Sequence, residues 1–423
     1  MEPSTGDAAW TDATLADMTV VTRLVTLDDV QAARELLAGV VRVTPLEGSR
    51  PLSAQVGGQV SLKCENLQRA GSFKIRGAYT RISRLTDSQR ASGVVAASAG
   101  NHAQGVALAG SLLGTAVKVF MPETAALPKV EATRSYGAEI ELFGRTVDEA
   151  LLAAAAYAES CGSVFIHPFD HPDVIAGQGT VGLEILEQCP EARTIVVCTG
   201  GGGLVSGIAA AVRGLRPDVR VVAVQAAGAA ALPHSLAVGE PVALESVSTM
   251  ADGIAVGKPG ELTLAHVEAL VDRVVEVSEQ SISRALLLCL ERNKLVVEPA
   301  GVAAVAAIMD EPHAYEPPVV AVLSGGNIDP VLMLRVIRHG LIAAGRYLSF
   351  RLRVPDRPGE LALLLAVLAE SGANVLDVGH LRTGPELRVD EVEVALQLET
   401  RGPDHSKQVQ AHLSEAGYPL VFG

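Results

Sequence analysis

The sequence predicts an α/β fold with parallel strands covered by helices, followed by a smaller antiparallel domain at the C-terminus. Short β-branched runs alternate with Ala- and Leu-rich stretches from about residue 27 to residue 345, which is typical of parallel sheets with helices on both faces. Four consecutive glycines, Gly200–Gly203, separate a strand-like run from a helix-like run. Residues 346–423 instead follow the order strand, helix, strand, strand, helix, strand, which is ferredoxin-like.

The elements of the first region follow from local composition. Apolar runs rich in Val and Ile indicate buried strands, and longer stretches with apolar residues at helical spacing indicate helices. In chain order, the candidate strands are 59–65, 93–98, 116–122, 139–144, 163–168, 194–199, 219–226 and 318–324, and the candidate helices are 72–85, 101–114, 127–137, 147–162 and 204–215. Ligands of such sheets bind beyond the carboxyl ends of the strands, so the loops after residues 97, 199 and 323 are candidate binding loops.

The C-terminal region has a different texture. Residues 347–382 indicate a strand, a Pro358–Gly359 turn, an amphipathic helix and a second strand. Strict alternation over 391–400 places Val392, Val394, Leu396 and Leu398 on one face, which predicts a half-buried antiparallel strand. A further helix and a short strand complete the predicted βαββαβ order.

Composition narrows the class of protein. The 423 residues are 48% hydrophobic and 19% charged, with a formal net charge of −14, which argues against nucleic acid or an anionic membrane as partner. Five scattered cysteines without C-x-x-C spacing indicate free thiols in a reducing cytoplasm. Thr194–Val212 lacks charge, but its four glycines disfavour a membrane span. Residues 1–26 do not resemble a signal peptide, and we expect them to be partly disordered.

The glycine run indicates close approach to an anion. A strand, a glycine loop and a helix start direct several backbone N–H groups and a helix dipole at one point, which suits a phosphate. The spacing matches neither the dinucleotide fingerprint nor a nucleotide-triphosphate loop, because Ile208 and Ala209 follow Gly207. A tight turn in an α/β core is the alternative. Lys74 is equally open at this level, since an exposed helical lysine beside apolar neighbours is the ordinary interpretation.

Four motifs together resemble one family. "GSFKIRGA" (71–78), "SAGNHAQG" (98–105), "TGGGGLVSG" (199–207) and "LSGGNID" (323–329) stand in the order of the fold-type II pyridoxal-phosphate enzymes, and look most like threonine ammonia-lyase. The resemblance covers residues 30–345, and the tail looks like an ACT domain. It implies a tryptophan synthase β-like fold with two α/β subdomains over 27–345, the smaller at about 80–160, and an ACT regulatory domain at 346–423.

The resemblance also implies the site. The expected cofactor-binding residues are Phe73, Lys74, Asn101, Gly200, Gly201, Gly202, Gly203, Leu204 and Ser324, and the expected substrate-binding residues are Ser98, Ala99, Gly100, Asn101 and His102. Lys74 would bind pyridoxal 5′-phosphate covalently and later remove the substrate's α-proton. A hydroxyl at Ser324, opposite the ring nitrogen, would favour loss of the β-hydroxyl over transamination. The implied reaction converts L-threonine to 2-oxobutanoate and ammonia, with L-serine to pyruvate as a secondary activity.

Several alternatives stay open. Serine racemase shares the first two motifs but has a second base where this chain has Ala99. Other fold-type II enzymes and a non-catalytic amino-acid sensor are further possibilities, although retention of Lys74 argues against the sensor. No required metal is expected, because the resemblance to serine racemase would place acidic metal ligands where this chain has Gln225 and small residues, and because prolines interrupt the pair His167 and His171.

The C-terminal region, residues 346–423, predicts regulation by an amino acid. Gly359 and Asn374 match places where ACT domains bind amino acids between paired modules, which implies an oligomer, a homotetramer or a homodimer, and an effector such as isoleucine or valine. The sequence does not distinguish a threonine from a serine preference, nor isoleucine biosynthesis from a catabolic role.

Overall fold

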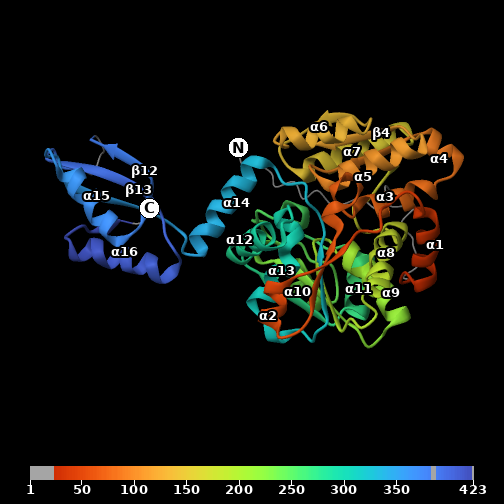
Figure 1. The fold of residues 1–423 in the computed structure, drawn as a ribbon. Helices are drawn as coiled ribbons and strands as arrows, with labels where there is room; N and C mark the ends of the chain where they lie inside the picture. Colours follow the sequence, from red (N-terminus) through yellow and green to blue (C-terminus); the bar gives the residue numbers. More distant parts are fainter. Residues whose placement is uncertain (1–22, 383–386, 422–423) are drawn as a thin grey trace. The chain divides into compact units, whose positions relative to one another are not determined.

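The computed structural model describes residues 23–382 and 387–421 (Figure 1). Contacts divide the chain into two compact units. The first holds the residues up to Ala285 together with Cys289–Asp329, and the second holds Leu286–Leu288 and the residues from Pro330 onward. The sequence places the boundary about sixteen residues later, at 345 and 346. Most of the predicted N-terminal tail lies outside the described residues.

A six-stranded sheet forms the centre of the first unit. Its strand order is β1-β2-β10-β7-β8-β9, and every neighbouring pair is parallel except β1 with β2. The strands are β1 (Leu46–Gly48), β2 (Val60–Cys64), β7 (Thr194–Cys198), β8 (Arg220–Ala226), β9 (Arg273–Val277) and β10 (Val319–Leu323). All residues of β2, β7 and β10 are buried, as expected for parallel strands covered on both faces.

A smaller parallel sheet lies in the same unit. Its order is β5-β4-β3-β6, and its strands are β3 (Val94–Ala97), β4 (Val117–Met121), β5 (Glu139–Leu142) and β6 (Val164–Phe165). In Figure 1 the helices α5, α6 and α7 gather around β4. Strands β3, β4 and β5 fall within the range expected for the smaller subdomain and β6 lies just beyond it. The prediction of an α/β fold with parallel sheets is confirmed.

Helices flank both sheets. Those of the first unit are α1 (Leu27–Leu37), α2 (Arg50–Val56), α3 (Lys74–Ser83), α4 (Asp87–Ala91), α5 (Asn101–Leu113), α6 (Leu127–Ser135), α7 (Val147–Cys161), α8 (Pro172–Gln188), α9 (Gly203–Leu215), α10 (Ala231–Val238), α11 (Glu261–Leu270), α12 (Glu279–Leu288) and α13 (Ala303–Asp310). Helices α8 and α9 pack backbone against backbone, since a Cβ on Gly207 would lie 2.2 Å from the carbonyl oxygen of Ile175. This close packing fixes where α9 begins, and therefore where the glycine loop lies.

The second unit has the predicted ferredoxin-like order. It comprises α14 (Pro330–Ala343), β11 (Tyr347–Pro355), α15 (Glu360–Ser371), β12 (Asn374–Leu381), β13 (Glu391–Glu399), α16 (Pro403–Glu415) and β14 (Leu420–Val421). The antiparallel sheet runs β12-β13-β11-β14. Val392, Val394, Leu396 and Leu398 are all buried, which confirms the face predicted from their alternation.

The uncharged stretch Thr194–Val212 is strand β7, the glycine loop and the start of α9. None of the helices in the described ranges combines the length and apolarity that crossing a membrane requires.

Candidate active site

The expected motifs meet at the carboxyl ends of neighbouring strands. Strand β10 lies between β2 and β7, with Leu323 beside Cys64 and Val322 beside Val197. The loops that follow β7 and β10 therefore leave the sheet side by side, as ligand loops of open parallel sheets do. Lys74 is brought to the same edge because the N–H of Phe73 donates to the carbonyl of Ser324 at 3.2 Å.

Lys74 is the first residue of α3 and is half-buried. Its Nζ donates to the carbonyl oxygen of Pro168 at 2.8 Å and lies 5.2 Å from the centre of the Phe73 ring. Burial lowers the pKa of Lys74 to about 8, although the nearby Glu298 carboxylate acts in the opposite direction. A primary amine with such a pKa is available as a nucleophile or base near neutral pH.

The glycine loop has no room for side chains. A Cβ on Gly201 would lie within 2.5 Å of three atoms of the Phe169 ring, and a Cβ on Gly203 would lie 2.9 Å from the Cβ of Phe169. Gly202 has a φ of +99°, which side chains rarely adopt. No side-chain hydrogen bond caps α9 at this end, so the first-turn N–H groups, including that of Leu204, are not occupied by a capping side chain.

Asn101 begins α5 directly after the loop Ser98–Gly100. Its Nδ2 donates to Glu298 Oε1 at 2.5 Å, and its Oδ1 accepts from Nδ2 of Asn327 at 2.8 Å. Burial raises the pKa of Glu298, while the bond from Asn101 lowers it. The side chain of Asn101 is thus held from two sides in one orientation.

The predicted substrate loop, Ser98–His102, lies against these groups. Ser98 Oγ accepts from the N–H of Gly100 at 3.1 Å, which shapes the turn. His102 is buried, its Nε2 bonds with the carbonyl of Ile166 at 2.8 Å, and burial together with the positive charge of Lys74 lowers its pKa to about 3. The imidazole is therefore a neutral, buried group that fixes the loop through its bond to Ile166.

A cation from the smaller sheet region also reaches this loop. Lys129 of α6 lies 4.0 Å from the position of a Cβ on Gly100 and pairs with Asp252 Oδ2 at 3.2 Å. Asp252 stands in a short 3-10 turn (Asp252–Ile254) of the larger region. The pair therefore joins the two parts of the first unit beside the predicted substrate position.

These residues fit the expected cofactor. Phosphate needs several N–H donors at one point, and the strand–glycine loop–helix arrangement of Gly200–Gly203 and α9 supplies them, with the neighbouring Ile254, Phe169 and Thr263 packed too closely for any Cβ on the loop. A covalently bound aldehyde needs an amine not held by a carboxylate, and Lys74 donates to a neutral carbonyl. Ser324 is buried on the next loop, and the Oγ of Ser72 is buried without a hydrogen-bond partner. The structure brings together all the predicted cofactor and substrate residues, whose individual roles stay predictions.

Some site residues had no predicted role. Asn327 stands inside the motif "LSGGNID", so motif position could have identified it. Glu298 is different, because "EPAG" matches a family motif of the domain cleft and was expected to help shape the substrate pocket. Pro168, Phe169 and Lys129 carry no comparable signal, because their contacts depend on how the smaller sheet folds back.

His167 and His171 both accept hydrogen bonds from nearby backbone N–H groups. The Nδ1 of His167 accepts from the N–H groups of Phe169 and Asp170, and the Nδ1 of His171 accepts from that of Asp173. Across 23–382 and 387–421 the structure contains no group of three or more His, Cys, Asp or Glu side chains placed to hold a metal ion.

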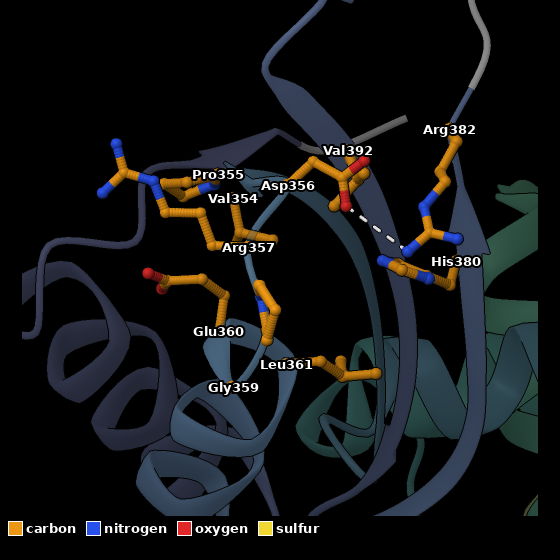
Figure 2. A pocket seen from close by; sticks show the side chains of 11 residues that line it. Val354, Pro355, Asp356, Arg357, Gly359, Glu360, Leu361, His380, Arg382 and Val392 are labelled. Atoms are coloured by element: carbon orange, nitrogen blue, oxygen red, sulfur yellow. Dashed lines mark hydrogen bonds and ion pairs between the residues drawn. The ribbon is translucent and has the colours of Figure 1, made fainter.

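The second unit contains a pocket of about 440 Å³ at the start of α15 (Figure 2). Charged and apolar side chains both line it: Val354, Pro355, Asp356, Arg357, Pro358, Gly359, Glu360, Leu361, His380, Arg382 and Val392. Asp356 and Arg382 pair at 3.4 Å, along the dashed line in Figure 2. Asn374 does not line the pocket. In the antiparallel sheet it pairs with Glu399, as Tyr347 does, and this end of the sheet is the one away from Gly359.

Comparisons with known proteins agree with this geometry. A family model described as pyridoxal-phosphate dependent enzyme matches residues 37–325. An L-threonine ammonia-lyase of Thermotoga maritima is 45% identical over 397 residues, covering 94% of this chain and 99% of the relative. A maize serine racemase structure has a TM-score of 0.71 at 36% identity, covering 76% of this chain and 99% of the other. A threonine deaminase structure from Solanum lycopersicum has a TM-score of 0.70 at 36% identity, covering 76% and 96%.

Proposed function

The chain belongs to the family of pyridoxal-phosphate-dependent enzymes, and we propose that it converts L-threonine to 2-oxobutanoate and ammonia. The observation that carries this proposal is the amine of Lys74, which has a lowered pKa and donates to a neutral carbonyl between the glycine loop and the asparagine loop. The similarity to L-threonine ammonia-lyase supports it over nearly the full length of both chains.

Each site residue has one task in this proposal. The bound cofactor withdraws electrons from the substrate's α-carbon. Gly200–Gly203 and the start of α9 would hold its phosphate, Phe73 would pack on its ring, and Asn101 would bind its ring oxygen. Lys74 would hold the cofactor at rest and, once released, would take the α-proton at Nζ. The backbone and side-chain donors of Ser98–His102 orient the substrate's carboxylate.

Two residues favour elimination over racemisation or transamination. Ser324 is buried and would offer a hydroxyl rather than a carboxylate to the ring nitrogen, which would make the cofactor a weaker electron sink and favour loss of the β-hydroxyl. Residue 99 is alanine, which cannot carry a proton to the face opposite Lys74. The proposal therefore expects the lyase reaction and no D-amino acid, despite the similar fold of serine racemase.

The test uses the purified protein loaded with pyridoxal phosphate. L-threonine should yield 2-oxobutanoate and ammonia, L-serine should yield pyruvate more slowly, and chiral chromatography should find neither D-threonine nor D-serine. Lys74→Ala should abolish keto-acid formation, whereas Lys407→Ala, an exposed lysine of α16, should leave it unchanged. Bound cofactor without keto acid from either substrate contradicts the dehydratase, and formation of D-serine favours the racemase.

We also propose that the second unit is an ACT domain that binds an amino acid in the pocket of Figure 2. Arg357 can bind a carboxylate, Glu360 an ammonium group and Val354 an apolar side chain, and the pair Arg382–Asp356 can open to add one charge to each. Valine and isoleucine have this combination of groups. Asn374, at the other end of the sheet, reaches the same ligand only if two copies pair, so the protein acts as a homodimer or homotetramer.

Light scattering during size-exclusion chromatography measures the oligomer, and titration with valine and isoleucine measures the effect on kcat and KM. Arg382→Ala should weaken the response to the effector and leave the basal activity unchanged. Lys407→Ala again serves as the control. A monomer, or activity that responds to neither amino acid, contradicts this part of the proposal.

A further inference from the structure

The connector between β6 and α8, residues 166–171, contacts three separate parts of the site. It leaves the smaller sheet after Phe165 and enters α8 at Pro172. On the way it meets Lys74, the glycine loop and the start of α11. Because this connector contacts Lys74, the glycine loop and α11, its conformation affects how these three are positioned.

Pro168 supplies the contact to Lys74. Its carbonyl oxygen accepts from Nζ at 2.8 Å. A carbonyl stabilises an ammonium group more than a neutral amine, because each ammonium proton needs an acceptor when water is absent. Proline has no N–H and a fixed φ, so the direction of this carbonyl depends on the residues that flank it.

His167 holds that carbonyl in place. Its Nδ1 accepts from the N–H of Phe169 at 3.3 Å and from that of Asp170 at 2.7 Å. Burial and the charges of Lys74 and His171 lower the pKa of His167 to about 3. The imidazole is therefore neutral at ordinary pH, and Nδ1 keeps the lone pair that both bonds require.

The rest of the connector is fixed at the phosphate cradle. The Phe169 ring fills the space that side chains at Gly201 and Gly203 would need, and it packs edge-on against His167 with ring centres 4.7 Å apart. Asp170 accepts from the N–H of Thr263 in α11 at 2.9 Å. Because both flanks are held, loss of the His167 bonds moves mainly the Pro168 peptide.

We propose that His167 is a positioning residue: it holds the Pro168 carbonyl so that the carbonyl accepts from the ammonium group of Lys74 while Lys74 carries the substrate's proton. The inference rests on the proposed function. In this step the carbon–hydrogen bond of the substrate breaks, the proton goes to Nζ, and the electron pair stays on the substrate. Without the carbonyl, the new ammonium group would lose its neutral acceptor.

The groups that face Lys74 are few. Glu298 favours the ammonium form, whereas His102 of α5 and His167 stay neutral beside it. Loss of the Pro168 carbonyl should therefore lower the pKa of Lys74, since Glu298 alone opposes the effect of burial.

The experiment compares His167→Leu, which removes the acceptor, with His167→Asn, whose Oδ1 can accept from the same two N–H groups. His171→Leu is the matched control, because His171 also accepts a backbone N–H through Nδ1, at 3.1 Å from Asp173, but no carbonyl behind it meets Lys74. The readouts are the pH dependence of cofactor uptake by the apoprotein, and kcat and KM for L-threonine.

Cofactor uptake reports on Lys74 directly, because only the neutral amine bonds to the aldehyde of pyridoxal phosphate, with loss of water. His167→Leu should lower the midpoint pH of the uptake rate by about one unit. It should also lower kcat by about 10- to 100-fold with little change in KM. His167→Asn should restore both, and His171→Leu should change neither, although it costs thermal stability.

An unchanged midpoint in His167→Leu, or equal effects of the two Leu variants, overturns the inference. If His167→Leu does not fold, His167→Gln replaces it, since its acceptor stands one atom further from the backbone, and it should show the same shift. If the wild type takes up the cofactor but forms no 2-oxobutanoate, the proposed function fails, while the uptake midpoint still decides the role of His167.

Discussion

Lys63 and Lys74 are two inward-facing lysines of the first unit with opposite surroundings. Lys63, on β2, is fully buried, and its Nζ donates to Glu184 Oε2 at 2.5 Å, to the carbonyl of Thr44 at 2.8 Å and to Gln188 Oε1 at 2.9 Å. All three ammonium protons have acceptors, and one acceptor is a carboxylate. Lys74 is half-buried and donates to a neutral carbonyl.

Arg76 completes the network around Lys63. Its guanidinium forms two bonds with Glu65 and two with Glu184, and the side chains of Arg76 and Glu65 are fully buried. Burial raises the pKa of Glu65, but Arg76, Lys63 and Thr44 outweigh it and hold that pKa below its ordinary value. Two cations thus face two carboxylates, and the cluster is neutral as a whole.

The comparison shows what distinguishes a reactive lysine from a structural one. Burial is common to both lysines, so burial alone does not distinguish the reactive one from the structural one. Burial lowers the pKa of both lysines, but at Lys63 the Glu184 carboxylate opposes this lowering and fixes the ammonium group. Among the residues that the structure describes, no carboxylate lies within bonding distance of Lys74, which leaves an amine that can lose its proton and bond to a cofactor. Because Arg76 stands two residues after Lys74 on α3, the neutral network also anchors the helix that presents the reactive amine.

Replacement of each lysine by methionine tests this contrast most strongly. Lys74→Met should lower kcat by at least about 10⁴-fold, because base and covalent anchor are lost together. Lys63→Met should instead destabilise the fold by about 3–5 kcal/mol, because it leaves buried negative charge unbalanced. Keto-acid assays and urea unfolding of both variants measure the two effects. A folded Lys63→Met with no activity, or an active Lys74→Met, would break the comparison.

The pH dependence of the apoprotein gives the next largest effect. The shift of the Lys74 pKa from 10.5 to about 8 corresponds to an about 300-fold larger neutral fraction at pH 7. Cofactor uptake should therefore rise with pH and level off above about pH 8. A rate that keeps rising toward pH 10 would mean that Lys74 is an ordinary solvated lysine.

The lowered pKa of Lys74 also makes the stability of the folded apoprotein depend on pH. The unfolded state binds the Lys74 proton more tightly than the folded state, so Lys74 costs stability below pH 8, and this cost shrinks between about pH 8 and 10.5. Apo Lys74→Met should be more stable than the apo wild type at pH 7, and the difference should decrease over that window. Urea unfolding of both apoproteins at several pH values measures it.

Gly201→Ala tests whether the glycine loop near Lys74 binds the cofactor. The new Cβ would lie 2.4 Å from an atom of the Phe169 ring, which should weaken cofactor binding by about 1–3 kcal/mol. Gly48→Ala is the control, since nothing lies within 4 Å of its Cβ position. Fluorescence titration of the apoproteins with pyridoxal phosphate compares them. Equal affinities would mean that the glycine run is only a turn.

The sequence predicted the fold and most of the site because these depend on local pattern. The strands of both sheets around Lys74, Asn101, Gly200–Gly203 and Ser324 lie where apolar β-branched runs predicted them, and the loops after them carry the motifs. Helix α8, strand β9 and the antiparallel strand β1 were not among the predicted elements. The seventeen residues of α8 are nearly all buried, so they lack the polar face by which amphipathic helices are recognised.

The contacts that sequence could not predict join residues far apart in the chain. The partner of Lys63, Glu184, is 121 residues away, and that of Lys74, Pro168, is 94 residues away. The residues next to Lys63 and Lys74 in the sequence do not indicate which lysine has a carboxylate partner and which has a carbonyl partner. The distinction arises only when α3 packs against α5 and α8, and when the connector after β6 reaches Lys74.

Lys129 lies between the structural and the reactive type of lysine, and its replacement should have the smallest effect on activity. It pairs with a carboxylate as Lys63 does, but Asp252 is 66% exposed, so the pair is worth less than about 1 kcal/mol. Because Lys129 lies close to Gly100, Lys129→Ala should raise KM for L-threonine by about fivefold through the lost attraction for its carboxylate. Asp252→Asn removes the pair but keeps the cation, so its KM should be unchanged or lower. Equal increases in the two variants would assign the effect to the ion pair, and would place Lys129 with the structural lysines.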